Sequence, residues 1–404
     1  ARATDVGHPT FLSPHASPIV VSGDRVFVTN TPADTVDVID ASSHAIVRRI
    51  NVGIDPVGLA IRPDGKEVWV SNHVSDSVSV IDNDAASATY MQVIATVQDF
   101  DPFTRATRFD EPVGIAFASN EKAYIALSSE NQIAVIDVAT RQVLKKITIT
   151  AQDPRAIEVR GDRLYVIPFE SNNRTQISGC VDRIDNDLCT FDATEHVVDN
   201  NNVLSTFAVV DIFKKPGVPD RDLYVFDTGT DQLVEVVNTL GTLLYGLTVD
   251  SKGTVFIAQT DARNDVNGRA GTRGDGLGEM ENRAFLNQVT QLDCSGIACA
   301  TPRFFELEPL PPMNPEAGMA LATPFAIEIS GEDTTLVMTA AGSNMLFTVD
   351  AASGEVLGRA KVGEVPRGIA LESNGAGQAS NAWVLNVAAN TVSLVDVSNP
   401  VSPG

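Results

Sequence analysis

The sequence is poor in basic residues and has no long apolar run. Its 404 residues include 29 Lys and Arg against 52 Asp and Glu, which gives a formal net charge of −23. This deficit of cations disfavours nucleic acid as a partner, because binding a phosphate backbone needs clustered Lys and Arg. No apolar stretch approaches the roughly 18 residues of a membrane-spanning helix. The sequence therefore predicts neither a nucleic-acid-binding protein nor a membrane-spanning segment.

Familiar catalytic and cofactor motifs are also missing. The sequence contains no Gly-x-Ser-x-Gly, no phosphate-binding glycine loop and no His-Glu-x-x-His. It contains no Cys-x-x-Cys-His, so this chain has no haem attachment site. These absences favour a non-catalytic role.

Cysteine is scarce, and its four copies form two close pairs. Cys180 and Cys189 are nine residues apart, and Cys294 and Cys299 are five residues apart. Neither pair has the usual spacing of a zinc site or a neighbouring His. We therefore predict two disulfides, and with them an oxidising compartment, periplasmic or extracellular. The chain starts at Ala1 rather than Met, which fits an exported protein whose signal peptide has been removed.

One phrase recurs along the chain. It reads x-Pro-x-Gly-x-Ala-x, a short turn, an apolar run ending in Asn or Ser, and then Val-x-Val-Ile-Asp. The clearest copy occupies residues 55–61, 68–72 and 78–82. Such β-branched runs between turn residues are strand signals. Their recurrence about every 40 residues, with four runs in each repeat, is typical of a propeller blade.

The number of opening phrases gives the number of blades. The phrase begins at Pro18, Pro56, Pro112, Pro154, Leu244, Pro324 and Pro366. We therefore predict an all-β protein, a single seven-bladed β-propeller domain over residues 1–404 with four-stranded blades. A count of eight would make residues 223–237 a separate blade, but it leaves no room for an inner strand. Because the last repeat stops after its third strand, we expect residues 4–12 to close it as the outer strand.

The end of the second strand carries a family resemblance. The matching residues are Phe27-Val28-Thr29-Asn30, Trp69-Val70-Ser71-Asn72 and Val384-Leu385-Asn386. The repeats resemble the YVTN-type β-propeller family, which is named for Tyr-Val-Thr-Asn. The resemblance covers almost the whole chain and implies the fold. Members include surface-layer proteins, secreted binding proteins, lactonase-like enzymes and propellers joined to c-type haem domains, so it leaves the function open.

Four insertions enlarge the connections between strands. They occupy residues 98–111, 169–204, 260–284 and 308–323. The first and last join consecutive blades, and the middle two join second to third strands. Both kinds of connection emerge on the same face of a propeller, so we predict that this face carries the functional site. We also expect the two middle insertions to pack beside each other over the channel mouth.

Charged residues gather on this face beside the central channel. Asp55, Glu111 and Asp153 each precede the proline that opens an inner strand, and Arg155 and Arg367 each follow one. His73 lies in the second-blade loop on the same face. We interpret these six residues as a candidate ligand site, a half-covered acidic funnel suited to a cation or a basic partner. Asp-Pro and Glu-Pro are also ordinary turn starters, so a purely structural role stays open.

Two insertions carry oxygen-bearing side chains at short steps. The first set is Asp182, Asp185 and Asp187, and the second is Asp261, Asp265 and Asn267. Such ligands suit Ca²⁺, so calcium is the candidate cofactor. Neither set completes a twelve-residue calcium loop, and Asp and Asn are common in any solvated loop.

Three functions fit these observations. The favoured one is an exported, non-catalytic binding or scaffold module that meets a protein partner through its long-loop face. The family resemblance implies a second, the propeller part of a periplasmic redox protein working with a c-type cytochrome domain. The third is a lactonase-like hydrolase, in which Asp55, Glu111, Asp153 and His73 would converge on one metal or one water.

Overall fold

Short runs of β-branched and aromatic residues, separated by turns of Gly, Asp, Asn and Ser, form the strands of this protein. The computed structural model describes residues 13–170, 221–263, 283–374 and 377–404. Within these ranges lie 27 strands and one short 3-10 turn, Thr31–Ala33. No helix in the described ranges is long and apolar enough to cross a membrane.

The first three blades follow one another in chain order, and each is an antiparallel four-stranded sheet. Blade one contains β1 (Ile19–Ser22), β2 (Arg25–Asn30), β3 (Thr35–Asp40) and β4 (Ile46–Asn51). Blade two contains β5 (Pro56–Ile61), β6 (Glu67–Asn72), β7 (Ser77–Asp82) and β8 (Val93–Val97). Blade three contains β9 (Pro112–Phe117), β10 (Lys122–Leu127), β11 (Gln132–Asp137) and β12 (Gln142–Thr148).

Blades four and five are joined into one sheet by a single pair, Glu170 with Leu243. Blade four contains β13 (Gln152–Arg160), β14 (Arg163–Glu170), β15 (Leu223–Asp227) and β16 (Leu233–Val237). Blade five contains β17 (Leu243–Val249), β18 (Thr254–Ala262), β19 (Phe285–Asp293) and β20 (Arg303–Glu306).

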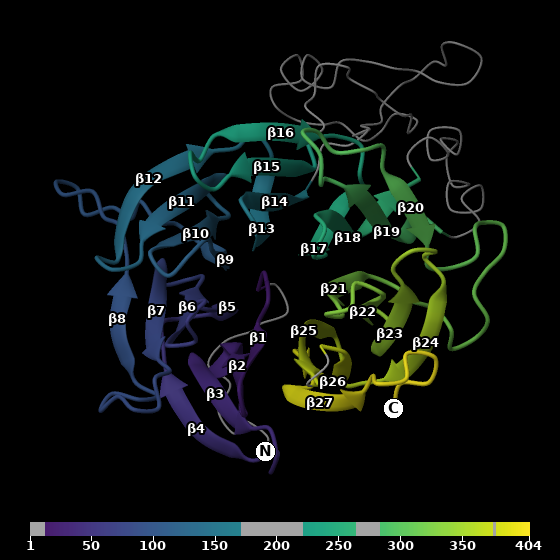
Figure 1. Cartoon of the computed structure of the whole chain (residues 1–404), viewed down its shortest axis with the longest axis horizontal. Coiled ribbons are helices and arrows are strands. Elements are labelled where there is room, and N and C mark those ends of the chain that lie inside the picture. The colour runs from purple at the N-terminus through teal and green to yellow at the C-terminus, as the bar shows by residue number, and fades with distance from the viewer. Residues whose placement is uncertain (1–12, 171–220, 264–282, 375–376) are drawn as a thin grey trace, which may run out of the picture.

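The last two blades return the chain to its start. Blade six contains β21 (Pro324–Ile329), β22 (Thr335–Ala340), β23 (Met345–Asp350) and β24 (Val356–Lys361). Blade seven contains β25 (Pro366–Ser373), β26 (Ala379–Asn386) and β27 (Thr391–Asp396). In Figure 1 the first strand of every blade lies beside the central axis and the later strands lie progressively toward the rim.

The predicted seven-bladed all-β propeller with four-stranded blades is confirmed. Strands β15 and β16 do not form an eighth blade, because β15 pairs with β14 in blade four. The strand that pairs with β14 in the described residues begins at Leu223, and the predicted end of the insertion at residue 204 lies outside the described residues. The third strand of blade four is β15, Leu223–Asp227, whose first four residues are buried.

The core lies between adjacent blades, where the middle strands face each other. Trp69 and Val80 of blade two pack in one cluster with Ile125 and Ile136 of blade three, and all four side chains are fully buried. Each large apolar side chain removed from water contributes about 1.5–3 kcal/mol. Outer strands are mostly exposed, as in β4. The ring of sheets is thus held together by contacts between blades, which keeps the inner strands in fixed positions around the axis.

The closing strand predicted at residues 4–12 lies outside the described residues. The other end of the chain folds back beside β27 within the described part. The backbone N–H of Asp396 donates to the carbonyl of Gly404 (2.8 Å), and the N–H of Gly404 donates to the carbonyl of Asp396 (3.0 Å).

Candidate functional site

A central channel with a cavity of about 330 Å³ runs along the inner strands. Its wall is built from β5, β9, β13, β17, β21 and β25, together with residues 15–17. Because consecutive strands are antiparallel, all connections from a fourth strand to the next blade and all second-to-third connections leave at one end of the channel. This end is called the long-loop face below, since the connections containing residues 98–111, 171–222, 263–284 and 307–323 all leave there.

One repeat position encircles the mouth of the channel on the long-loop face. It follows the opening proline, or its equivalent in blade five, and it falls in a β-bulge. The pairing of the inner strand shifts between Pro154 and Ala156, between Leu244 and Gly246, and between Pro366 and Gly368. A bulged residue lies outside the regular pairing, and bulges commonly re-aim a side chain beside a site. The bulged residues of blades four to seven are Arg155, Tyr245, Phe325 and Arg367.

Blades two and three close their half of the mouth with apolar side chains. At the same repeat position they carry Val57 and Val113, and both pack in a buried cluster with Ala16. The segment holding Ala16 is fixed by backbone bonds, since Ala16 N–H donates to the Val57 carbonyl (3.1 Å) and Leu59 N–H to the Ser17 carbonyl (3.0 Å). This half of the mouth is therefore sealed.

His15 belongs to the sealing segment and borders the channel. Its Nδ1 lies 3.1 Å from the Ser13 carbonyl oxygen, and its Nε2 lies 3.0 Å from Thr31 Oγ1. Burial, together with the nearby positive charge of Arg367, lowers the pKa of His15 to about 3. The imidazole is therefore neutral at ordinary pH and adds no charge to the mouth.

The other half of the mouth is lined by aromatic rings flanked by arginines. The Arg155 guanidinium lies 3.8 Å from the Phe169 ring centre, and that ring meets Tyr245 at 5.7 Å. Tyr245 in turn lies 5.3 Å from Phe325, and the Arg367 guanidinium lies 5.1 Å from the Phe325 ring centre. We call these five residues the mouth arc. It spans blades four to seven, and every member touches the next.

The two arginines of the mouth arc differ in their electrostatic partners. Arg155 is neutralised by Asp153, with 3.0 Å between Nε and Oδ1. Arg367 forms no ion pair with any carboxylate of the described residues, and its Nη1 donates to the Ser13 carbonyl at 3.2 Å. Its buried Nε has no hydrogen-bond partner there. Burial lowers the pKa of Arg367, and the nearby Arg155 lowers it further.

The three predicted mouth carboxylates occupy left-handed turns. Asp55, Glu111 and Asp153 have φ values of 60°, 50° and 60°. Each backbone N–H is capped by a side chain from the preceding blade, by Asp34 Oδ1 (3.0 Å), Asp76 Oδ1 (3.1 Å) and Asn131 Oδ1 (2.8 Å) respectively. Val365 repeats the arrangement, with φ 54° and a cap from Asn344 Oδ1 at 2.9 Å. Asp and Asn are enriched among non-glycine residues with this conformation, so the turn accounts for Asp55 and Asp153 but not for the choice of Glu111.

The carboxylates and His73 lie near one another without forming a metal-type cluster among the described residues. Asp55 is buried and accepts a hydrogen bond from Ser13 Oγ (2.7 Å). Glu111 Oε2 lies 3.8 Å from His73 Nε2, and burial raises the pKa of Glu111. Burial lowers the pKa of His73, whereas the negative charges of Asp55 and Asp153 act to raise it, and its Nδ1 has no hydrogen-bond partner among the described residues. In the described ranges, no three His, Cys, Asp or Glu residues gather as a metal site.

Two glutamates deeper in the channel were not found from the sequence. Glu158 of β13 and Glu328 of β21 stand where other repeats carry Ala60, Ala116 and Ala370. Burial, with a smaller contribution from the charge of Glu328, raises the pKa of Glu158 to about 8, and burial raises that of Glu328 to about 7. The signal that could have found them is this exchange of a small residue for an acid at a channel-lining position of the repeat.

Arg160 is the cation nearest these two glutamates. It lowers both of their pKa values and holds its own place by donating from Nε and Nη2 to the Val249 carbonyl, at 3.1 and 2.7 Å. The interior of the channel is thus less negative at neutral pH than its composition suggests.

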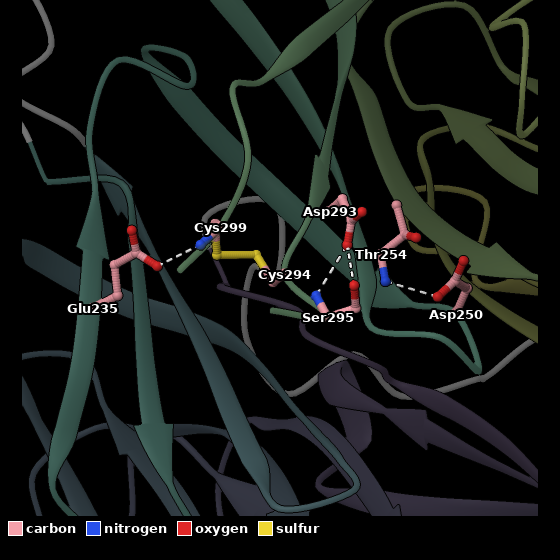
Figure 2. The surroundings of a disulfide bond; sticks show 7 residues. All are labelled: Glu235, Asp250, Thr254, Asp293, Cys294, Ser295 and Cys299. Atoms are coloured by element: carbon pink, nitrogen blue, oxygen red, sulfur yellow. Dashed lines mark hydrogen bonds between the residues drawn. A yellow bond between two sulfur atoms is a disulfide. The ribbon is translucent and has the colours of Figure 1, made fainter. Parts of the chain in front are cut away.

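One predicted disulfide is confirmed in the described part of the chain. Cys294 and Cys299 are bonded with an S–S distance of 2.08 Å in the β19–β20 connection, on the face opposite the long loops. Figure 2 shows the Cys299 N–H donating to Glu235 of β16, at 2.7 Å, which ties this loop to blade four.

The remaining predicted ligands fall mainly outside the description. Cys180, Cys189, Asp182, Asp185, Asp187, Asp265 and Asn267 lie outside the described residues, as does the predicted packing of the two middle insertions. Asp261 is described, and its Oδ1 accepts a hydrogen bond from Thr242 Oγ1 (3.2 Å). Calcium in these loops stays a prediction.

Comparison with known proteins agrees with the architecture. A family model described as a YNCE-like beta-propeller matches residues 9–111, which include the first two blades. A search of curated proteins returns no match. Hydrazine synthase from Kuenenia stuttgartiensis is similar in structure, with a TM-score of 0.67 and 18% identity over 97% of this chain and 96% of that chain.

Similarity at this level supports the fold alone, because one fold serves many functions. The solved chains that match number 1699, which makes the architecture a poor guide to activity. The chain is therefore a β-propeller that is similar to the YNCE-like family in its first two blades, and the narrower YVTN-type assignment stays a prediction.

Proposed function

We propose that this protein is an exported, non-catalytic binding module that meets a partner protein through its long-loop face. The observation that carries the proposal is the concentration of all four enlarged connections at one end of the ring. Rigid scaffolds commonly carry their binding residues on such loops.

The β8–β9 connection offers an anchor for a partner. Its tip presents Phe103, whose exposure is 93%. Asp101 orders this tip, because its carboxylate accepts from the backbone N–H groups of Phe103 (2.9 Å) and Thr104 (2.8 Å). A bridge between Phe100 and Thr107 closes the connection below the tip. An aromatic side chain held in water by an ordered loop is suited to fill a partner's pocket.

A matched pair of substitutions tests the proposal. Ile297, in the disulfide loop on the opposite face, is 94% exposed and thus as accessible as Phe103. Wild type, Phe103→Asp and Ile297→Asp would be immobilised and incubated with the exported fraction of the source cells. Retained proteins would be quantified by mass spectrometry, and the melting temperatures compared beforehand.

We expect a partner that wild type and Ile297→Asp retain equally and that Phe103→Asp loses by at least about tenfold, as expected for an anchor worth more than about 1.4 kcal/mol. A partner that is lost from Ile297→Asp instead of Phe103→Asp would refute the proposal. So would the absence of any protein whose retention differs between the two variants.

The two alternative functions have less support in the described residues. A lactonase-like hydrolase needs Asp55, Glu111, Asp153 and His73 on one point, whereas Asp153 pairs with Arg155 and Asp55 accepts from Ser13. The redox alternative requires a c-type cytochrome partner, and no feature of the described residues indicates one. The periplasmic or extracellular location belongs to the proposal through the Cys294–Cys299 disulfide, which suits an oxidising compartment.

A further inference from the structure

We propose that the open half of the channel mouth binds a small aromatic carboxylate, with Arg367 holding the carboxylate and the rings of Tyr245 and Phe325 holding the planar body. This inference rests on the proposed function in that it names a ligand class for the same face. It reverses the acidic funnel expected from the sequence, because the charge exposed to the channel at this point is positive.

The first step of the argument is the charge of Arg367. No carboxylate of the described residues pairs with it, and its buried Nε donates to nothing there. Its neighbour Arg155 repels it rather than compensating it. A buried guanidinium without a counter-ion is unfavourable, and an unsatisfied donor adds to that cost. A carboxylate in the channel would supply the missing counter-charge and accept hydrogen bonds from the guanidinium.

The second step is the shape of the mouth arc. Tyr245 and Phe325 lie 5.3 Å apart at an interplanar angle of 36°, and Arg367 is stacked against the Phe325 ring. The Tyr245 hydroxyl lies 3.3 Å from Thr260 Oγ1, which fixes its ring. The side chains of Tyr245, Phe325 and Arg367 all line the cavity. A planar ring inserted here gains offset contacts with aromatic faces while its carboxylate reaches the guanidinium.

The third step is size and exclusion. The cavity of about 330 Å³ is at the lower end of the range usual for small-molecule sites. The sealed half, with Val57 and Val113, fixes the opposite wall. A ligand of one or two fused rings therefore fits the arc, whereas a folded chain segment does not.

The fourth step is the absence of repulsion from the channel acids at moderate pH. Around Glu158 stand Glu328 of β21, Arg160 of β13 and the backbone of Val249 of β17, and around Glu328 stands Arg160. With pKa values of about 8 and about 7, both acids are largely protonated below pH 7. They ionise as the pH rises through this window and then repel an anion, so binding should weaken between about pH 7 and 8.

Binding of 2-naphthoate, followed by its fluorescence and by calorimetry, tests the inference. The neutral 2-naphthamide has the same rings without the charge, and inorganic sulfate has the charge without the rings. Arg367→Gln removes the guanidinium, and Arg367→Lys keeps the charge and guards against a folding defect. Arg48→Gln on exposed β4 is the matched control.

We expect saturable 2-naphthoate binding by wild type and Arg48→Gln, at least about tenfold weaker binding by Arg367→Gln, and an intermediate loss for Arg367→Lys. The amide and sulfate should bind far more weakly. No saturable binding up to about 1 mM, equal binding of the amide, or an unchanged affinity in folded Arg367→Gln would overturn the inference.

Phe103→Asp separates this inference from the proposed function. It should bind 2-naphthoate like wild type, because Phe103 is not among the residues that line the channel. If 2-naphthoate does not bind but a partner that depends on Phe103 is found, only the ligand site is refuted. If no partner depends on Phe103 but 2-naphthoate binds through Arg367, the ligand site stands without the docking role.

Discussion

Individual charges inside the channel behave differently from the strongly negative chain that carries them. Arg367 keeps an uncompensated positive charge at the mouth, while Glu158 and Glu328 hold their protons deeper in the channel. The sum over the chain, a net charge of −23, describes the outer surface and says little about this interior. The same burial that makes ionisation costly also makes each of these groups sensitive to pH.

Glu158→Gln should make stability less dependent on pH. Between the ordinary pKa of 4.5 and the folded value of about 8, the folded protein keeps the Glu158 proton and the unfolded chain releases it. The free energy of unfolding of wild type therefore falls as the pH rises through this window. At about pH 8.5 we expect the variant to be more stable than wild type by about 1–3 kcal/mol.

Urea denaturation of both proteins at about pH 5 and about pH 8.5 would measure this difference. A difference between variant and wild type that is the same at both pH values would contradict a buried, protonated Glu158.

His15 should make the protein sensitive to acid. Its folded pKa of about 3 lies below the ordinary 6.5, so the unfolded chain binds a proton that the folded protein does not. Stability is therefore lost as the pH falls from about 6.5 toward 3. His15→Gln should flatten this loss in thermal melts between about pH 7 and 4, and an unchanged profile would contradict it.

A candidate site residue could be predicted from the sequence where it departs from the residue usual at its position in the repeat. Arg155 and Arg367 were predicted as ligand-binding residues because they stand out beside the repeat prolines, and both lie in the mouth arc. The mouth carboxylates stay predicted ligands, because an aspartate that begins a left-handed turn looks the same in sequence as one that binds a cation. The pairing of Arg155 with Asp153 and the isolation of Arg367 depend on how the ring brings distant strands together.

At the scale of elements, the connection between neighbouring blades depends on a repeated side-chain cap. Asn131 follows β10 with φ 53° and caps the N–H of Asp153 in the next blade. Asp34 and Asp76 do the same for the two preceding blades. Asn131→Gly keeps the backbone conformation and removes the cap, and should cost about 1 kcal/mol.

Asn131→Asp is the control that the chain itself suggests, since aspartate caps two of the other junctions. Thermal melts should rank wild type and Asn131→Asp together and Asn131→Gly below them. If both variants melt together, the cap is not what stabilises the junction.

The β19–β20 loop is held at two points, by its disulfide and by Glu235. Replacing Cys294 and Cys299 by serine should lower stability by about 2 kcal/mol, as chain entropy predicts for so short a loop. Reversible unfolding of the double variant measures this loss, and 2-naphthoate binding on the other face should not change. Weakened ligand binding would show that the two faces are coupled.

Element boundaries were predictable where the repeat phrase was intact. The opening prolines at positions 56, 112, 324 and 366 are the first residues of their strands. The third strand of blade four was not, because a long insertion separates it from its partner. Pairing with β14 places β15 in blade four, and that contact spans too many residues for local pattern to reveal.

For the molecule as a whole, the periodic phrase was sufficient to predict seven blades, because the repeat spacing sets how many sheets the chain forms. The closure of the ring is a separate matter. Deleting residues 1–12 should lower the melting temperature of the whole protein, because an unpaired outer edge in blade seven would weaken a cooperative ring. Differential scanning calorimetry should show one transition shifted downward, and an unchanged transition would reject closure by this segment.

The β-bulge at the mouth has a consequence for how such proteins change. Since the bulged residue is outside the regular pairing of its strand, its identity can vary without loss of sheet hydrogen bonds. A few codon changes at positions 155, 245, 325 and 367 could therefore replace one specificity with another while the scaffold stays intact. A library randomised at these four positions would be a natural starting point for making new binders from this ring.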